Sequence, residues 1–422
     1  MVTKDRIIVG LEVGTSKVCA VVGEVLEDGN LTIIGVGQAA SEGVRKGEIV
    51  NVEAAVRNIQ SAICAAEDSA GVEIHNIYAS VTGGHIGSFN NRGSVVVTND
   101  DSAISGEDVH NVMLNAKSVS IPMDHVVVHA IRQHFFVDGH DGIQNPVGLI
   151  GTRLEADVHV IHGVRNRLVN NINCIKQVPL DVANIAVSSF ASALAILTTE
   201  HQQLGAVVID MGGGTTDYIV YREGTVQHSG VIAVGGDHVT NDIAIGLKIP
   251  MNRAEHLKIE HGNALVAEWS DEIPLKREVG LPERTVSKQQ LCRIINLRVE
   301  EILMLIRKEL EKQNLLDYLG AGVFITGGCA RLRGMETLAY QVFGGLPIHI
   351  GPGDKGCGGL VVDRPAGVSG PTAAIESPEF STAIGLVRYA LYSQRDQHLP
   401  PTVWQRAGQK FQQLVAKVRM FI

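Results

Sequence analysis

Two segments of the chain, almost two hundred residues apart, share one pattern of apolar and polar positions. Residues 8–22 read IVGLEVGTSKVCAVV and residues 207–221 read VVIDMGGGTTDYIVY. In each, an apolar run is followed by an acidic residue, a glycine turn with a threonine, and a second apolar run. Apolar runs separated by glycine turns are typical of paired β-strands. The pattern predicts two similar hairpins in which Glu12 corresponds to Asp210, Gly14 to Gly212, and Lys17 lies close to the position of Thr215.

Helical and strand-like patterns alternate along much of the remaining chain, as in α/β folds. Residues 51–70 carry Val52, Val56, Ile59 and Ile63 at helical spacing, and a strand is expected at 77–81. Further helices are expected at 187–197, 254–261 and 288–313. The last begins with a capping pattern at Ser287 and Gln290 and has one apolar stripe that predicts core positions: Leu291, Ile295, Ile302, Ile306 and Leu310.

The pattern becomes strand-rich between residues 85 and 163. Strands are expected at 94–98, 125–137 and 154–161, with one helix at 107–119 that opens with a capping pattern at Ser105 and Asp108. We interpret this block as an inserted subdomain. The predicted organisation is a first lobe (1–84), the insertion (85–163), a return to the first lobe with an inter-lobe helix (164–196), a second lobe (197–390) with a subdivision at about 240–315, a linker (391–402) and a terminal helix (403–422).

Composition narrows the class of protein. A chain of 422 residues with 45% apolar residues is too long for one compact core and suits two lobes. The net charge of −9 argues against bulk nucleic-acid binding. The six cysteines are scattered without a CxxC pair, which predicts reduced thiols. The first residues lead directly into a strand and no run of about eighteen apolar residues occurs, so we expect neither a secretory signal nor a membrane span.

The chemistry of the two glycine turns points to phosphate. Glycines allow backbone N–H groups to approach phosphate oxygens without obstruction by a Cβ. Two facing turns would hold a polyphosphate from both sides, and the acids Glu12 and Asp210 would bind magnesium on the phosphates through water. Any single glycine turn is more simply an ordinary hairpin, but the repetition with the acid in register favours a nucleotide site. The expected phosphate-binding residues are Gly14, Thr15, Ser16, Lys17, Gly212, Gly213, Gly214, Thr215 and Thr216.

A third glycine-containing loop supports the nucleotide interpretation. Residues 322–333 read GVFITGGCARLR, an apolar strand that runs into Thr326, Gly327 and Gly328. A loop of this shape can lie flat against a purine and ribose, where side chains would collide. Gly235 and Gly236 predict a further turn at phosphate or ribose. Neither GxxxxGK[ST] nor a GxGxxG between a strand and a helix is present in the sequence.

Several histidines fall within the predicted insertion. They are His125, His129, His134, His159 and His162. Strand alternation places His125 and His129 on one face and His134 on the other, and no carboxylate recurs at ligand spacing. We therefore expect structural or surface roles and no metal site.

The C-terminal residues form the second strong pattern. A proline-containing segment, SQRDQHLPPT, precedes residues 403–422, which contain no acidic residue. At helical spacing the apolar residues gather on one side and the basic residues flank them. A core helix would also be amphipathic, but the preceding linker, the single sign of charge and the aromatic residues favour a helix that lies in a membrane interface. The expected membrane-contacting residues are Trp404, Arg406, Lys410, Phe411, Leu414, Val415, Lys417, Val418, Phe421 and Ile422.

Together, these motifs resemble the superfamily of actin, sugar kinases and heat-shock chaperones, and within it most closely the bacterial FtsA family. The resemblance is carried by the three loops and by GLEVGTSKV, NPVGLIGTRLEADVH (residues 145–159) and AEHLKIEHGNA (residues 254–264). It implies an actin-like (ribonuclease H-like) two-lobed α/β fold, with ATP and Mg²⁺ as ligands. Glu12 departs from the aspartate usual at its position.

The resemblance also implies residue roles and partners. Glu255 and Lys258, which otherwise suggest only a surface ion pair, would contact ribose and adenine. Arg298, with Glu301 beside it, would bind the C-terminal peptide of FtsZ. The inserted subdomain, called 1C in the family, would contact other protomers and division proteins. The resemblance further implies that the protein self-assembles and binds anionic lipids at the cytoplasmic face of the inner membrane. Ser188 stands where relatives place a water-orienting acid or glutamine, which implies weak or absent hydrolysis.

Two alternatives share the fold. A pilus-assembly adaptor of the PilM type would not be expected to carry the terminal amphipathic helix. A cytosolic phosphotransferase would need a base aimed at a substrate hydroxyl, which the helix at 187–197 lacks.

Overall fold

Two five-stranded sheets with the same strand order form the two lobes. Their orders are β3-β2-β1-β6-β11 and β14-β13-β12-β17-β18. In each sheet the first three strands are antiparallel and the last two run parallel to the third. The computed structural model describes residues 6–26, 31–99, 101–267, 270–275, 283–351 and 376–396. The two apolar repeats of the sequence are the equivalent hairpins β1–β2 and β12–β13, which confirms the predicted duplication.

The first lobe is built mainly from the N-terminal part of the chain. Helix α1 begins after Asn51, whose side chain accepts a hydrogen bond from Ala54 N–H, and ends at Gly71 with a φ of 68°. The elements are β1 (Ile7–Val13), β2 (Lys17–Val25), β3 (Leu31–Ala40), β4 (Val44–Arg45), β5 (Glu48–Ile49), α1 (Val52–Ala70), β6 (Asn76–Val81), α3 (Arg165–Ile175) and β11 (Asp181–Val187).

The second lobe follows the connecting helix α4 (Ser188–Ile196). Its central strand, β12, is buried along its whole length, as expected for a strand covered on both faces. The elements are α5 (Thr199–Leu204), β12 (Ala206–Met211), β13 (Thr216–Arg222), β14 (Thr225–Ile232), α6 (Gly236–Leu247), α7 (Met251–His261), β15 (Glu272–Leu275), β16 (Arg284–Ser287), α8 (Lys288–Lys312), β17 (Gly322–Thr326), α9 (Met335–Val342), β18 (Ile348–Ile350) and α11 (Ser381–Asp396), with short 3₁₀ turns at Leu316–Tyr318, Gly328–Arg331 and Pro378–Phe380.

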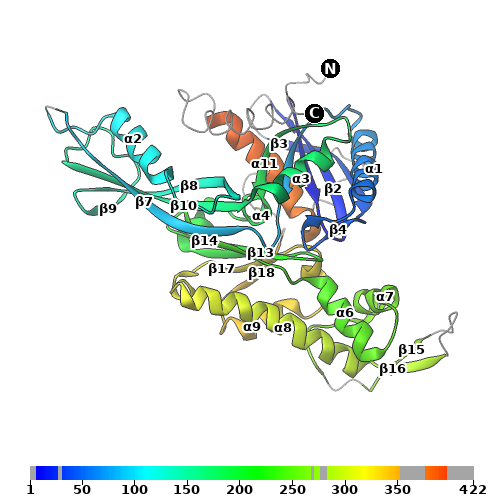
Figure 1. The fold of residues 1–422 in the computed structure, drawn as a ribbon. Helices are drawn as coiled ribbons and strands as arrows, with labels where there is room; N and C mark the ends of the chain where they lie inside the picture. Colours follow the sequence, from blue (N-terminus) through cyan, green and yellow to red (C-terminus); the bar gives the residue numbers. More distant parts are fainter. Residues whose placement is uncertain are drawn as a thin grey trace.

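A third sheet projects sideways from the first lobe (Figure 1). Its order is β7-β10-β8-β9, and α2 packs on β7 and β10. Helix α2 opens with a capping box between Ser105 and Asp108, as predicted. The elements are β7 (Gly87–Val96), α2 (Gly106–Lys117), β8 (His125–Val137), β9 (His140–Ile143) and β10 (Arg153–Val164).

This inserted sheet also touches the second lobe, along the edge strand β14. Gln133 Nε2 donates to Val226 O (2.6 Å), and Ser88 Oγ donates to Ser229 O (2.6 Å). His159 is fully buried and bridges Asn90 Oδ1 and Ser229 Oγ, and burial lowers its pKa to about 3. Side chains of the insertion therefore cover a strand edge that would otherwise expose unpaired backbone groups.

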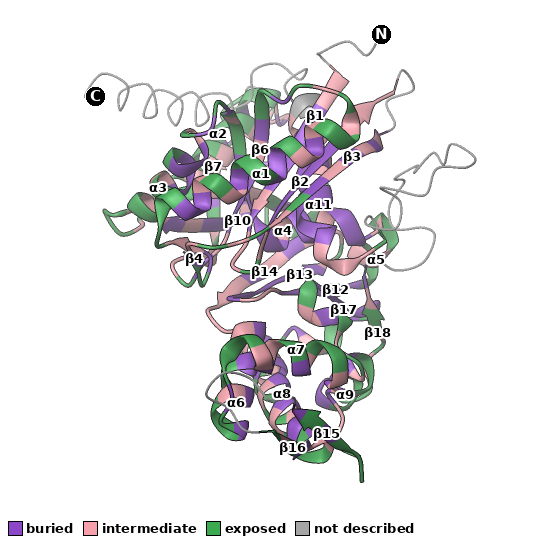
Figure 2. Ribbon diagram, turned by 90° about the vertical axis from the view of Figure 1, so that its right-hand side faces the viewer, coloured by how far each residue is buried: buried purple, intermediate pink, exposed green. Residues whose placement is uncertain are grey.

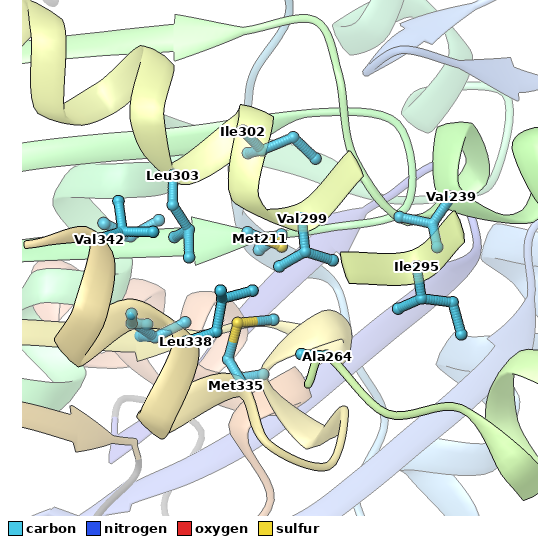
Figure 3. Close-up of a cluster of buried hydrophobic side chains, with 14 of the residues drawn as sticks. Met211, Val239, Ala264, Ile295, Val299, Ile302, Leu303, Met335, Leu338 and Val342 are labelled. Carbon is cyan, nitrogen blue, oxygen red and sulfur yellow. The ribbon is translucent and has the colours of Figure 1, made fainter. Parts of the chain in front are cut away.

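Helices cover both faces of each sheet. Helices α1 and α3 pack on the outer face of the first sheet, and α6, α8 and α9 on the outer face of the second (Figure 1). In Figure 3, Met211 of β12 points toward Val299 of α8 within this second core. Helices α4 and α11 lie between the sheets, in a core shared by both lobes. Figure 2 colours the central strands of both sheets as buried.

The structure differs from the sequence-based expectations in three places. Val52 is 42% exposed, because Ala54, Ala55, Ala62 and Ala66 form the buried face of α1 together with Ile59 and Ile63. Helix α11 continues to Asp396, so the first part of the predicted linker is helical. The predicted second lobe included residues up to 390, yet α11 contacts β1, β2 and β6 of the first lobe.

The predicted stripe of α8 is confirmed, since Leu291, Ile295, Ile302, Ile306 and Leu310 are all buried. The predicted membrane helix, residues 403–422, lies outside the described residues. Among the helices that the structure does describe, none combines the length and apolar character needed to cross a bilayer.

Candidate functional site

The two glycine bends have the same backbone geometry. Gly14 N–H donates to Lys17 O and Gly212 N–H donates to Thr215 O, both at 2.9 Å. These equivalent hydrogen bonds confirm the register expected from the sequence, with Glu12 and Asp210 each two residues before the bend glycine.

The bends face each other across the two lobes. A Cβ added to Gly213 would lie 3.1 Å from Ser16 Cβ, and one added to Gly214 would overlap the hydroxyl of Thr15. Glycine is therefore required where the second bend meets the first. The β4–β5 turn completes the contact, because Gly47 N–H donates to Thr15 Oγ1 (3.1 Å) and the backbone of Lys46 lies against Gly214.

The first bend carries its own ion pair. Lys17 Nζ lies 2.8 Å from Glu12 Oε2, and both side chains are mostly buried. Burial raises the pKa of Glu12, with Lys17 acting in the opposite direction. Burial alone would lower the pKa of Lys17, but the charge of Glu12 outweighs it and the pKa is raised. The ammonium group is thus held charged beside the bend.

The second bend has hydroxyl groups where the first has an ammonium group. Asp210 Oδ2 accepts hydrogen bonds from Ser192 Oγ of α4 (2.5 Å) and from Thr382 Oγ1 of α11 (2.7 Å). Burial raises the pKa of Asp210, and the two hydroxyls oppose that shift. Met211 points into the outer core, so strand alternation directs Asp210 toward the other lobe.

A third buried acid, Asp217, was not identified from the sequence. It lies on β13 directly opposite Asp210, and its Oδ1 accepts a hydrogen bond from Thr82 Oγ1 of the first lobe (2.6 Å). Burial raises the pKa of Asp217 to about 7. The available signal was a lone carboxylate within the otherwise apolar strand 216–221.

Three acids at the bends lie close together with one paired cation. Glu12, Asp210 and Asp217 are largely buried and influence one another's pKa values, and within the described part of the chain only Lys17 forms an ion pair with any of them. Buried carboxylates without compensation are costly, so this site favours a bound cation. Within the described ranges no three His, Cys, Asp or Glu side chains come close enough to form a metal cage.

The third loop lies beside the second bend. Gly327 has a φ of 84°, and a Cβ there would lie 2.5 Å from Asp210 Oδ1. Gly328 is exposed, and a Cβ at this position would meet open space. Thr326 is fully buried and donates to Pro378 O (2.9 Å), so its hydroxyl is used within the fold. The loop therefore presents an unobstructed surface at Gly328.

Gly235 and Gly236 brace the second bend. Gly236 N–H donates to Gly212 O (2.9 Å), and the next residue, Asp237, donates from its N–H to Gly213 O (2.8 Å). Thr216 is also committed to the fold, because its buried hydroxyl donates to Val234 O (2.8 Å). The N–H groups of Gly236 and Asp237 therefore orient the bend itself.

Glu255 and Lys258 converge on the start of α6. Lys258 Nζ lies 2.7 Å from Glu255 Oε2 and donates to Gly236 O (3.2 Å) and to Thr240 Oγ1 (2.8 Å). Cys329 of the third loop donates to Gly212 O (3.5 Å), and a Cβ on Gly236 would lie 2.5 Å from its sulfur. The ion pair, the second bend and the third loop thus form one continuous surface.

The remaining predicted residues lie elsewhere or are already paired. Ser188 is buried at the start of α4 and donates to Val81 O (3.4 Å). Arg298 bridges Asp242 of α6 (2.6 Å) and Glu301 (2.5 Å). The sequence did not indicate Asp242 as a partner.

The predicted histidines of the insertion also contact other residues. His125 and His162 contact each other through their Nδ1 atoms (2.7 Å). His129 accepts a hydrogen bond from Val187 N–H, and burial lowers its pKa to about 4. His134 contacts Thr225 Oγ1.

Sequence comparisons give consistent matches. A family model described as "Cell division protein FtsA" matches residues 207–385, and one described as "SHS2 domain inserted in FTSA" matches residues 83–162. FtsA of Pseudomonas aeruginosa is 36% identical over 397 residues, covering 94% of this chain and 92% of its own length. FtsA of Borreliella burgdorferi is 38% identical over 387 residues, covering 91% of each.

Solved structures match at lower identity. A PilM–PilN type IV pilus biogenesis complex has a TM-score of 0.65 at 15% identity and covers 91% of this chain and 98% of its own. MreB5 of Spiroplasma citri bound to ADP has a TM-score of 0.55 at 15% identity and covers 94% and 100%. At this identity the likeness establishes the fold alone, which is the two-lobed actin-like architecture.

Proposed function

Because the chain belongs to the FtsA family of cell-division proteins, we propose that it acts in division as an ATP-binding adaptor that ties FtsZ polymers to the cytoplasmic face of the inner membrane. The sequence relatives confirm the family resemblance and a role in cell division. The observation that carries the nucleotide part is the meeting of two equivalent glycine bends over buried carboxylates.

In this proposal the bends bind the phosphates from two sides. Backbone N–H groups of the bends, the hydroxyls of Thr15 and Ser16, and the ammonium group of Lys17 would contact phosphate oxygens. Asp210, with Glu12 in a lesser role, would hold magnesium through water. When bound, magnesium would neutralise part of the negative charge of the phosphates.

The purine and ribose would lie at the third loop. Gly328 leaves space for a flat ring, and the Glu255–Lys258 pair is placed to offer an acceptor and a donor at the edge of the nucleoside. Isothermal titration with Mg·ATP tests this arrangement. The Lys258→Met variant should bind ATP several-fold more weakly, while its Mg²⁺ requirement should be unchanged. ATP that binds with unaltered affinity would place the purine elsewhere.

We expect weak or absent ATP hydrolysis. The hydroxyl of Ser188 donates to a backbone carbonyl, that of Val81, and so is engaged within the fold. Without a group that orients and deprotonates water, a phosphate clamp stabilises charge but lacks its base. A single-turnover assay checks this, and a rate near those of ordinary kinases would contradict it. In that case Asp217, whose pKa is raised to about 7 by burial, becomes the first residue to replace.

Membrane attachment rests on residues 403–422. Each large apolar group that is fully buried contributes about 1.5–3 kcal/mol and each basic residue near an anionic surface about 1 kcal/mol, against a backbone ordering cost of about 1–2 kcal/mol per residue. One tail should bind reversibly, whereas tails arrayed on a self-assembled polymer should hold firmly. Vesicle sedimentation tests this idea. Deleting residues 403–422 should abolish ATP-dependent recruitment of FtsZ filaments, an outcome that a soluble phosphotransferase would not show.

We assign binding of the FtsZ C-terminal peptide to the outer face of α8. Arg298 already bridges Asp242 and Glu301, so an incoming peptide carboxylate would have to exchange with one of them. Arg298→Ala should weaken binding of an FtsZ C-terminal peptide, measured by fluorescence anisotropy. Arg293→Ala, which removes an exposed arginine from the same helix, is the matched control. Equal losses for both variants would indicate nonspecific charge attraction. The inserted subdomain remains the proposed contact for protomers and other division proteins.

A further inference from the structure

Helix α11 begins inside the candidate nucleotide site, and its contacts there are polar. In its first turn, Ser381 Oγ contacts Thr326 Oγ1 (2.7 Å) and Thr382 Oγ1 donates to Asp210 (2.7 Å). Immediately before it, Pro378 O accepts hydrogen bonds from Gly327 N–H (3.2 Å) and from Thr326 Oγ1 (2.9 Å). These residues therefore touch the second bend and the third loop at once.

The same segment also reaches the first bend. The ring of Phe380 lies 5.4 Å from Lys17 Nζ, and Glu379 influences the pKa of Glu12. A short run of five residues, 378–382, thus contacts Asp210 and the third loop and also reaches Lys17 of the first bend.

The body of α11 is wedged between the lobes by backbone contacts. Gly385 lies so close to the backbone of Ala191 that a Cβ would overlap it, and Gly10 of β1 packs in the same way against Ala383. Ala383, Ile384 and Val387 belong to the core shared by both sheets. Because backbone meets backbone at α4 and at β1, a shift of α4 relative to β1 cannot be absorbed by a side-chain rotation and must move α11.

The hydrogen bond from Thr382 fixes the direction of the Asp210 carboxylate. In the proposed function this carboxylate holds magnesium through water, so the orientation that Thr382 gives it and the position of the bound phosphate depend on each other. A nucleotide that binds to the positioned carboxylate would therefore stabilise the docked first turn of α11.

From this juxtaposition we propose that α11 is the nucleotide-sensing element of the chain: Thr382 positions Asp210, and nucleotide binding fixes α11 between the lobes. The proposal rests on nucleotide binding as proposed above. By linkage, α11 docking and nucleotide binding must strengthen each other by the same factor.

Hydrogen–deuterium exchange of the full-length protein, with and without Mg·AMP-PNP, tests this coupling. In the wild type we expect saturating nucleotide to slow exchange across residues 381–396 by about tenfold. Thr382→Val should weaken nucleotide binding about five- to fifty-fold and abolish the slowing even at saturation. Thr382→Ser, which keeps the hydroxyl, should restore both.

Two further variants separate the positioning of Asp210 from the coupling between nucleotide and α11. Ser192→Ala removes the other hydroxyl on Asp210 and its contact with Thr382 Oγ1 (2.9 Å) but keeps the hydrogen bond from Thr382 to Asp210, so it should weaken binding and reduce the slowing of α11 much less than Thr382→Val does. Ser393→Ala removes a hydroxyl that donates to Ala390 O within α11, away from Asp210, and should change neither property. Binding without any change in α11 exchange in the wild type, or an unaltered response in Thr382→Val, would overturn the proposal while leaving nucleotide binding in place. Failure of every protein to bind Mg·AMP-PNP would overturn both.

Discussion

The two glycine bends have the same backbone geometry, but their buried carboxylates are stabilised by different groups. In the first bend, Glu12 is paired with Lys17, five residues away in the same hairpin. In the second, Asp210 depends on Ser192 and on Thr382, which is 172 residues distant. The charge of Glu12 is therefore balanced by a cation within its own hairpin. The second is completed only when two helices from other parts of the chain are in place, which makes it the bend that can respond to conformation.

The largest expected effect comes from breaking the ion pair of the first bend. Lys17→Met leaves Glu12 buried without a partner and should cost about 3–5 kcal/mol of unfolding free energy at pH 7. Asp210→Asn in the second bend keeps an acceptor oxygen for both hydroxyls and should cost only about 1–2 kcal/mol. Urea denaturation without nucleotide measures both. The double variant Glu12→Gln/Lys17→Met should recover most of the loss, and equal losses in the two bends would contradict the comparison.

The second effect is a pH dependence that originates in the second bend. Burial raises the pKa of Asp217 from 3.8 to about 7, so the folded state binds the proton more tightly than the unfolded state does. Its contribution to stability is therefore present at low pH and is lost as pH rises from about 4 to about 7. Asp217→Asn should remove this slope and be more stable than the wild type at pH 8, by on the order of 2–4 kcal/mol. Parallel stability curves between pH 4 and 8 would show that Asp217 is solvated.

The third effect concerns magnesium. In the proposed function Asp210 is the main carboxylate for magnesium, because Lys17 already pairs with Glu12. Asp210→Asn should lower the affinity for Mg·ATP about 10- to 100-fold, which is typical when a residue that hydrogen-bonds a metal's ligands is replaced. Glu12→Gln should have a smaller effect. Titration with ATP in EDTA provides the control, since the difference between the variants should vanish there. A larger loss for Glu12→Gln would reverse the assignment.

The smallest expected effect is a difference in stability between alanine substitutions at the two equivalent glycines, Gly14 and Gly212. A Cβ on Gly14 would lie 2.8 Å from Lys17 O, whereas one on Gly212 would lie 3.3 Å from Thr215 O. Gly14→Ala should destabilise the protein by about 1–2 kcal/mol, and Gly212→Ala by less than about 1 kcal/mol. Thermal unfolding of the two variants side by side measures the difference, and the reverse order would mean that the first bend relaxes more easily.

Local patterns explain what could be predicted. The paired hairpins, the capped starts of α2 and α8 and the core stripe of α8 depend on residues a few positions apart, so periodicity and capping specify them. The equivalence of Gly14 and Gly212 followed from the same repeat. The strand order of the insertion and its contact with β14 did not, because they join residues such as His159 and Ser229 that are 70 positions apart.

The sequence by itself determined the duplicated hairpins, the acids at their ends and the family to which the chain belongs, because each of these is written in short, ordered motifs. Only the tertiary structure decided that Asp217 accepts a hydrogen bond from Thr82 of the other lobe, that Gly236 braces the second bend, and that α11 lies between the lobes with Thr382 on Asp210. The physical reason is that burial and hydrogen bonding of a carboxylate depend on which distant helices close over it. No local pattern around Asp210 encodes the hydroxyl that reaches it from α11.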